Sequence, residues 1–146
     1  MHPTIQKIKQ ENVVRLHEKN GETKYVGELD KDGKYHGLGK EFDMKGNLVK
    51  EGYYKEGLLS GNWARLFQET PSNYGKKIWF KSYEGSIFEG VEHGLGKEFY
   101  PSGKLFYEGN YKNGQRFSTN GKIYFENGNV KYIGGFVNSM YDGLGI

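Results

Sequence analysis

The histidines are the first side chains to consider for chemistry. His36 and His93 each open the same heptapeptide, His-Gly-Leu-Gly-Lys-Glu-Phe, at residues 36–42 and 93–99. A histidine can serve as a general base or a metal ligand, but each role needs a partner group held nearby. No second histidine stands at metal-ligand spacing from either copy, and the other two histidines are isolated. We therefore interpret His36 and His93 as turn residues, and we predict no catalytic residue and no metal site.

Carboxylates are the second group to consider. Glu51, Glu84 and Glu108 each precede a glycine, and paired carboxylates carry out acid–base chemistry in glycoside hydrolysis. Here they recur far apart along the chain, which favours exposed charges that face lysines on adjacent strands. The Gly-Leu-Gly-Lys stretch lacks the spacing of a phosphate-binding loop, and no serine has a base at a motif distance. We expect neither an enzyme nor a cofactor.

These residues belong to an ordered series of slots, which indicates a repeat protein. Each unit holds a marker glycine, an apolar residue two positions later, a turn glycine, a Gly-x-Gly pair and an aromatic or aliphatic residue. In the second unit the Gly-x-Gly slot reads Gly61 and Trp63. Units begin near residues 25, 50, 83, 107 and 132, and the marker glycines, interpreted as structural, are Gly27, Gly52, Gly85, Gly109 and Gly134.

The elements that position these slots are predicted to be strands. Segments between the glycines are short and alternate in polarity, as in Tyr25-x-Gly-x-Leu29, which is typical of β-strands. Turn sequences such as Met44-Lys45-Gly46-Asn47 supply the positive φ of tight hairpins. Each unit is thus one β-hairpin, and neighbouring hairpins stack so that their aromatic residues form a stripe. The marker glycines then make room for rings from the neighbouring hairpin, and the identical heptapeptides imply two hairpins in one environment.

The pattern Tyr-Glu-Gly-Asn-Tyr-Lys-Asn-Gly at residues 107–114, with His-Gly-x-Gly in other units, resembles the MORN repeat. The resemblance covers residues 13–146 and five units. It implies an all-β fold, an elongated, single-layer, twisted antiparallel sheet of consecutive β-hairpin repeats. It also implies a scaffold on cytoskeletal or ciliary structures, or a binder of acidic phospholipids. The Gly-Lys-Glu-Phe part of the unit resembles the variant repeat, which also occurs in bacterial antitoxin-like proteins.

Length and composition limit the remaining classes. The chain has 146 residues, a net charge of +3 and no cysteine, so we expect one domain, no disulfide and no nucleic-acid partner. No apolar run is long enough to span a bilayer. Residues 1–12 read as a polar tail without the apolar core of a secretory signal. We expect a cytoplasmic protein, with the cytoskeletal or ciliary association that the resemblance implies.

Two irregularities interrupt the pattern. About 68–77, Pro, Ser and Asn predict an inserted exposed loop, which either binds a partner or is a longer hairpin that protrudes. The last unit stops at Gly145-Ile146, before its second strand. This predicts an unpaired sheet edge near Tyr132, Phe136 and Tyr141, open to a second copy or to another protein.

The composition favours binding through aromatic residues, which make up 16% of the chain. We predict a non-enzymatic protein-interaction or scaffold module in a larger assembly. An alternative is a peripheral binder of anionic lipid, and a third is an antitoxin-like immunity partner, on resemblance alone. The candidate protein contacts are Tyr54, Trp63, Trp79, Tyr111 and Phe136, and the candidate lipid contacts are Lys76, Lys77 and Lys81.

Overall fold

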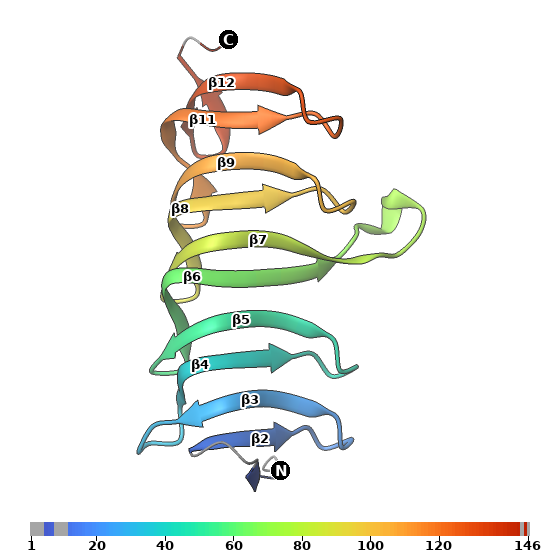
Figure 1. The fold of residues 1–146 in the computed structure, drawn as a ribbon, viewed down its shortest axis with the longest axis vertical. Helices are drawn as coiled ribbons and strands as arrows, with labels where there is room; N and C mark the ends of the chain where they lie inside the picture. Colours follow the sequence, from blue (N-terminus) through green and yellow to red (C-terminus); the bar gives the residue numbers. More distant parts are fainter. Residues whose placement is uncertain (1–4, 8–11, 144, 146) are drawn as a thin grey trace.

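The structure, a computed structural model, describes residues 5–7, 12–143 and 145. These residues form one antiparallel sheet of thirteen strands in sequence order, with β10 off the path against β9. Figure 1 shows the hairpins stacked into a tall column. The strands are β1 (Ile5–Lys7), β2 (Val13–His17), β3 (Thr23–Leu29), β4 (Tyr35–Phe42), β5 (Leu48–Lys55), β6 (Leu58–Glu69), β7 (Trp79–Phe88), β8 (Val91–Phe99), β9 (Leu105–Lys112), β10 (Gln115–Arg116), β11 (Ser118–Tyr124), β12 (Val130–Val137) and β13 (Met140–Asp142). The predicted all-β fold of consecutive hairpins is confirmed.

A row of small residues crosses the sheet at right angles to the strands. Its members stand opposite one another on successive strands, and each marker glycine lies in it. They are Gly27, Gly39, Gly52, Ala64, Gly85, Gly96, Gly109, Gly121 and Gly134. A Cβ built on Gly96 would lie 2.3 Å from the hydroxyl oxygen of Tyr83. Larger side chains are therefore excluded because rings lie against this row.

The rings come from the marker strands themselves. Tyr25, Tyr83, Tyr107 and Tyr132 each stand two residues before a marker glycine and donate a hydroxyl hydrogen bond to the carbonyl three residues onward. The Tyr107 ring packs edge-on against Tyr111 and Phe136, with centroids 5.3 and 5.1 Å apart. The expectation that rings come from the neighbouring hairpin is therefore corrected: each covers a glycine of its own strand and one of the next strand.

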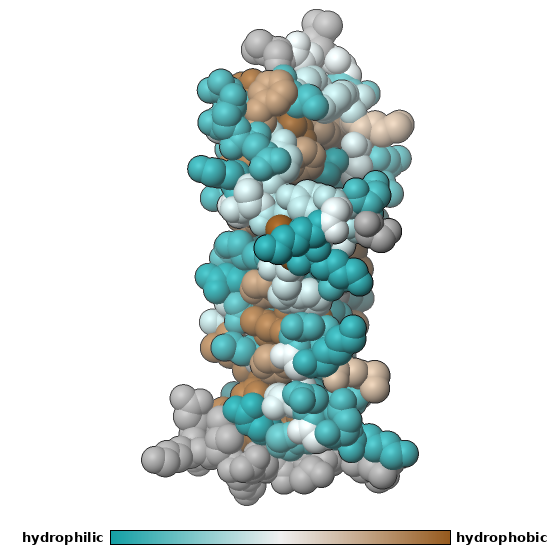
Figure 2. Space-filling model, turned by 90° about the vertical axis from the view of Figure 1, so that its right-hand side faces the viewer, coloured by the Kyte–Doolittle hydropathy of each residue, from teal (hydrophilic) through white to brown (hydrophobic). Residues whose placement is uncertain are grey.

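The aromatic stripe is the hydrophobic core of the protein. Bulges just beyond the glycine row bend the strands, so the inter-unit turns fold back over the rings. Successive turns are joined by backbone hydrogen bonds, such as Gly57 N to Tyr35 O at 3.1 Å and Gly90 N to Leu59 O at 2.8 Å. Figure 2 shows the other edge of the column, where hydrophilic side chains predominate and hydrophobic ones appear between them.

The core divides into two clusters near β6 and β7. Tyr25, Tyr54 and Leu59 belong to the first, whereas Tyr83 and Tyr107 belong to the second. The division coincides with the irregular second unit, in which Lys50 occupies the slot of the marker tyrosine and Ala64 replaces a glycine of the row.

The two identical heptapeptides lie in different environments, so the prediction of one environment is wrong. In the second copy, Glu98 accepts hydrogen bonds from Arg116 Nε at 2.5 Å and from the Tyr111 hydroxyl at 2.6 Å. In the first copy, the strand position that corresponds to Arg116 holds buried Leu59. The buried Tyr54 hydroxyl, equivalent to that of Tyr111, makes no hydrogen bond of normal geometry among the described residues, although burial raises its pKa and Glu41 is close enough to raise it further. The difference arises because the neighbours come from the following turn, outside the heptapeptide.

The inserted loop projects from the sheet between β6 and β7 (Figure 1) and contains the 3-10 helix η1 (Ser72–Tyr74). Its base is held by buried Thr70, whose backbone N donates to Ile78 O at 2.9 Å and whose hydroxyl oxygen accepts from Ile78 N at 3.1 Å. Strand β6 continues through Glu69, so the loop begins later than the predicted 68–77.

Both ends of the described chain contribute to the sheet. Residues 5–7 of the predicted tail form β1, which pairs with β2. Strand β13 pairs with β12 at Gly135–Val137, which corrects the expectation that the last unit stops before any second strand. Ile146, placed at the predicted open edge, lies outside the described residues.

A candidate binding trough on the polar face

The face opposite the core carries a line of alternating charges, which we call the charge ladder. Each member stands directly opposite a residue of the other sign on the next strand, an arrangement that stabilises strand pairing. In sheet order the ladder is Lys40, Glu51, Arg65, Glu84, Lys97, Glu108 and Lys122. This register confirms the prediction that Glu51, Glu84 and Glu108 face basic residues on adjacent strands. The expectation that they are exposed is wrong, because Glu51 is buried and Glu84 and Glu108 are half-buried.

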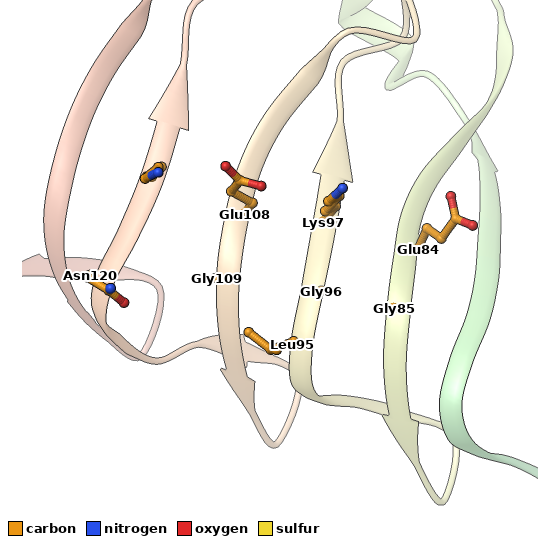
Figure 3. A pocket seen from close by; sticks show the side chains of 9 residues that line it. Glu84, Gly85, Leu95, Gly96, Lys97, Glu108, Gly109 and Asn120 are labelled. Carbon is orange, nitrogen blue, oxygen red and sulfur yellow. The ribbon is translucent and has the colours of Figure 1, made fainter.

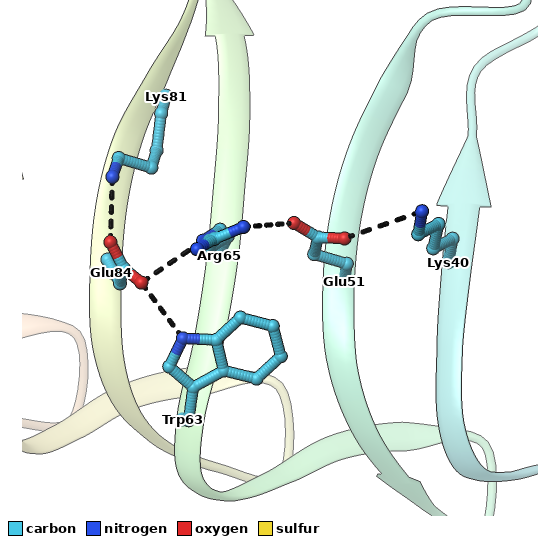
Figure 4. Close-up of polar contacts among 6 residues, drawn as sticks. All are labelled: Lys40, Glu51, Trp63, Arg65, Lys81 and Glu84. Atoms are coloured by element: carbon cyan, nitrogen blue, oxygen red, sulfur yellow. Dashed lines mark hydrogen bonds and ion pairs between the residues drawn. The ribbon is translucent and has the colours of Figure 1, made fainter. Parts of the chain in front are cut away.

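The first half of the ladder is closed by ion pairs, as Figure 4 shows. Arg65 lies between two carboxylates, with Nη1 3.1 Å from Glu51 Oε1 and Nε 3.1 Å from Glu84 Oε2. Lys81 Nζ lies 2.7 Å from Glu84 Oε1. Partial burial acts to raise the pKa of Glu84, but hydrogen bonds from Lys81, Trp63 and Arg65 prevail and lower it to about 2.

Trp63 completes this network from within β6. Its indole Nε1 donates to Glu84 Oε2 at 2.9 Å, and the Arg65 guanidinium lies 5.1 Å from its ring centroid. The sequence pattern placed Trp63 in the Gly-x-Gly pair. The structure corrects this, since Ala64 takes the place in the glycine row and Trp63 lies on the polar face.

A trough of about 710 Å³ lies beyond Trp63, over β7 to β11; we call it the C-terminal trough. Figure 3 shows its glycines in line, with the charge ladder on one side and Leu95 and Asn120 on the other. Leu95 is 70% exposed. The lining residues are Glu84, Gly85, Leu95, Gly96, Lys97, Glu108, Gly109, Asn120 and Lys122.

The trough contains two basic side chains available to a ligand. Within the described residues, neither Lys97 nor Lys122 makes an ion pair within 4.0 Å. Between them, Glu108 accepts a short hydrogen bond from the Tyr124 hydroxyl. Lys97 and Lys122 in the second half of the ladder can therefore bind a ligand, whereas the charged side chains of the first half already form ion pairs with one another.

A smaller trough of about 380 Å³ lies on the other side of Trp63, over β2 to β6. Leu38 and Tyr53 stand opposite each other there, more than half exposed, and the Tyr53 ring lies 6.5 Å from that of Trp63. Trp63 therefore stands between an apolar stretch of the polar face and a charged one.

Three of the predicted protein contacts are core residues, which corrects that prediction. Tyr54, Tyr111 and Phe136 are 3, 5 and 1% exposed, so they present no surface to a partner. Trp63 is half-buried in the network described above. Trp79 is more exposed, and its indole donates to Leu48 O at 2.9 Å.

The predicted lipid contacts do not form one cationic patch. Lys76 and Lys77 are exposed in the inserted loop, with Lys77 Nζ 3.8 Å from Glu69. Lys81 is paired with Glu84 and lies 4.3 Å above the Phe99 ring.

Sequence reasoning missed Leu95, Lys97 and Lys122 as contact residues. The signal that could have found them is a basic residue after the Gly-x-Gly pairs at Gly39, Gly96 and Gly121, together with a glutamate before the marker glycines Gly52, Gly85 and Gly109. In a hairpin stack these two slots come to face each other on adjacent strands.

The histidines stay apart in the structure. The His93 ring accepts a hydrogen bond from Asn113 N at 3.4 Å, whereas the backbone carbonyl of His36 accepts one from Tyr25 at 3.4 Å. No set of three or more His, Cys, Asp or Glu among the described residues is arranged to hold a metal ion. The described part of the chain also contains no helix long and apolar enough to cross a membrane.

Comparison with protein families agrees with this architecture. The MORN repeat model matches residues 25–47 and 132–146, and the MORN repeat variant model matches residues 92–113 and 120–138. A search of curated proteins gives no match. Both models fall on hairpins that carry the glycine row and the marker tyrosine, and the chain therefore carries MORN repeats of both forms.

Proposed function

We propose that the chain is a non-enzymatic protein-binding module that holds a segment of another protein in the C-terminal trough. The observation that carries the proposal is the exposed Leu95 beside Lys97 and Lys122, two lysines that form no ion pair with any described residue, above a floor of glycines on a continuous sheet. The repeats support it as well, since MORN repeats generally take part in protein–protein or membrane–lipid interactions.

The same architecture suits a scaffold subunit of a larger assembly. Hydrogen-bonded hairpins in one column hold binding positions at fixed distances along its length. A cytoplasmic site of action, at cytoskeletal or ciliary structures, is the part of the proposal that rests on the family alone. Contact with a second copy at the C-terminal sheet edge also belongs to the proposal.

Site-specific photo-crosslinking tests the trough as the contact surface. A photoreactive amino acid at position 95 should give adducts with a discrete protein in native extract. The same amino acid at Lys45, in an exposed turn at the sheet edge, should give none. Equal adducts at the two positions, or no adduct at position 95, would contradict the proposal.

Anionic lipid is the second candidate, because Lys76 and Lys77 project from the sheet in the inserted loop. Each lysine near an anionic surface contributes about 1 kcal/mol, so two give weak binding. Co-sedimentation with vesicles of phosphatidylcholine and phosphatidylserine should depend on both lysines, and Lys76→Gln/Lys77→Gln should abolish it. Binding that survives this double change would rule out the loop as the lipid contact.

A further inference from the structure

We propose that the occupant of the C-terminal trough is an α-helix with acidic and basic side chains alternating at successive turns. This inference rests on the proposed protein-binding function and specifies the partner. The helix crosses strands β8 to β11, pairing acidic residues with Lys97 and Lys122 and a basic residue with Glu108.

The spacing of the ladder selects a helix over an extended peptide. Adjacent strands lie about 4.8 Å apart, so Lys97 and Lys122, two strands apart with Glu108 between them, repeat at about 10 Å. Helical residues seven apart share a face and are separated by about 10.5 Å. Side chains on one face of an extended peptide repeat at about 6.7 or 13 Å, and neither matches.

Charge places the helix on this half of the ladder. Glu51 and Glu84 are both bound by Arg65, and Lys40 lies 4.0 Å from Glu51. All charged residues of the ladder before Lys97 therefore already have ion-pair partners. Lys97 and Lys122 have none within 4.0 Å in the described chain. A helix with glutamate at positions i and i+7 and lysine at i+4 complements these three rungs in order.

The shape of the trough suits a helix of about three turns. Gly85, Gly96 and Gly109 line the floor with backbone (Figure 3), because a side chain at Gly96 or Gly109 would point toward the tyrosine rings on the other face of the sheet. Leu95 gives the apolar face of the helix a contact. From Glu84 to Lys122 the ladder spans three strand spacings, about 14 Å, which corresponds to about 10 helical residues.

Designed peptides of about 15 residues, alanine-rich and helical, provide the probes. The matched peptide carries Glu, Lys and Glu at i, i+4 and i+7; the inverted peptide carries Lys, Glu and Lys at these positions. A third peptide has the matched composition with its two glutamates two residues apart. In ¹⁵N-labelled protein, the matched peptide should shift the amides of Gly85, Gly96 and Gly109 but leave Gly27 unchanged. It should bind about tenfold more tightly than the inverted peptide, because three attractive pairs become three repulsive ones.

A charge-reversed protein is the matched control. Lys97→Glu/Glu108→Lys/Lys122→Glu should prefer the inverted peptide, while Lys40→Gln should bind like wild type. If the reversed protein misfolds by circular dichroism, Lys97→Gln/Lys122→Gln replaces it and should remove the preference. Equal binding of the matched and mis-spaced peptides would overturn the helix, as would shifts outside the trough. Phosphatidylserine vesicles that shift the same glycines as strongly as the matched peptide would overturn it in favour of an anionic surface.

The outcomes separate the two proposals. Adducts at position 95 without any preference among the peptides would leave the protein-binding function standing and remove the helix. A clear peptide preference without adducts from extract would retain the charge-matched site and remove the proposed role in binding a cellular protein.

Discussion

Neutralising Glu84 tests the reasoning about the charge ladder most directly. Glu84 accepts hydrogen bonds from Trp63, Arg65 and Lys81, which connects β6 to β7 at the junction between the two core clusters. Glu84→Gln keeps the side-chain size and an acceptor oxygen but removes the charge. Its effect therefore reports the electrostatic part of the network.

The magnitude follows from the pKa of Glu84, lowered from 4.5 to about 2. A difference of about 2.5 units corresponds to about 3 kcal/mol of stability. The side chain is 25% exposed, and solvent screening reduces the expected value to about 2 kcal/mol. Because the folded pKa is lowered, this contribution is complete above pH 4.5 and is lost as the pH falls toward 2.

Urea unfolding of wild type and Glu84→Gln between pH 7 and pH 2 measures this difference. We expect the variant to be less stable by about 2 kcal/mol at pH 7 and the two unfolding free energies to converge near pH 2. Glu126→Gln, in an exposed turn, is the control and should change little at any pH. A Glu84→Gln deficit that stays constant down to pH 2 would refute the electrostatic origin of the effect.

Other features of the sheet give three further predictions. Gly96→Ala should lower the free energy of unfolding by about 3 kcal/mol, because the new Cβ meets the Tyr83 ring. Gly103→Ala has open space around its Cβ and should lower it by only about 1 kcal/mol, the cost of an alanine at φ +92°. Thermal unfolding of the two variants measures the difference. Arg116→Leu should lower the free energy of unfolding by about 2 kcal/mol, because it leaves the Glu98 carboxylate without its ion-pair partner. Adding Glu98→Gln should restore much of this stability in urea titrations; no loss in the single variant would show that the pair contributes nothing. Burial raises the pKa of Tyr107 to about 12 against 10 when unfolded, so stability should fall as the pH rises from 10 to 12. The difference in absorbance at 295 nm between wild type and Tyr107→Phe should appear together with the loss of the circular dichroism signal; a difference that appears near pH 10 while the protein is still folded would disprove this.

Most of the fold could be predicted from the sequence because its repeat is carried by backbone requirements. Glycines at fixed intervals mark the tight turns and the row against which the tyrosines lie. Both requirements for glycine, the turn conformation and the space for a tyrosine ring two residues earlier, can be recognised within a few residues of sequence. The face of the sheet on which a given side chain lies is harder to predict from the sequence. Trp63 occupied an apparent glycine slot, yet a bulge between Gly61 and Ala64 moves it to the other face. A shift of one residue exchanges the two faces of a strand, and only the pairing partner fixes it.

The binding residues were harder to predict, because aromatic character alone does not distinguish core from surface in a single sheet. Aromatic character alone predicts Tyr54 and Tyr111 as exposed contacts. The bulged strands and folded-back turns bury them. The available side chains are instead the leucine and lysines that flank the glycines on the other face.

The two identical heptapeptides show why a repeated motif does not define a site in this architecture. Each copy supplies one face of a strand, while the atoms that complete its surroundings come from the next turn, where Leu59 corresponds to Arg116. The same principle governs the ladder. Lys40 and Lys97 hold the same heptapeptide position, but Lys40 lies 4.0 Å from Glu51, whereas Lys97, between Glu84 and Glu108, makes no ion pair within 4.0 Å among the described residues. Specificity in a hairpin stack therefore resides in differences between neighbouring units, and substitutions at Arg65 should alter the charge available to a partner more than substitutions within either heptapeptide.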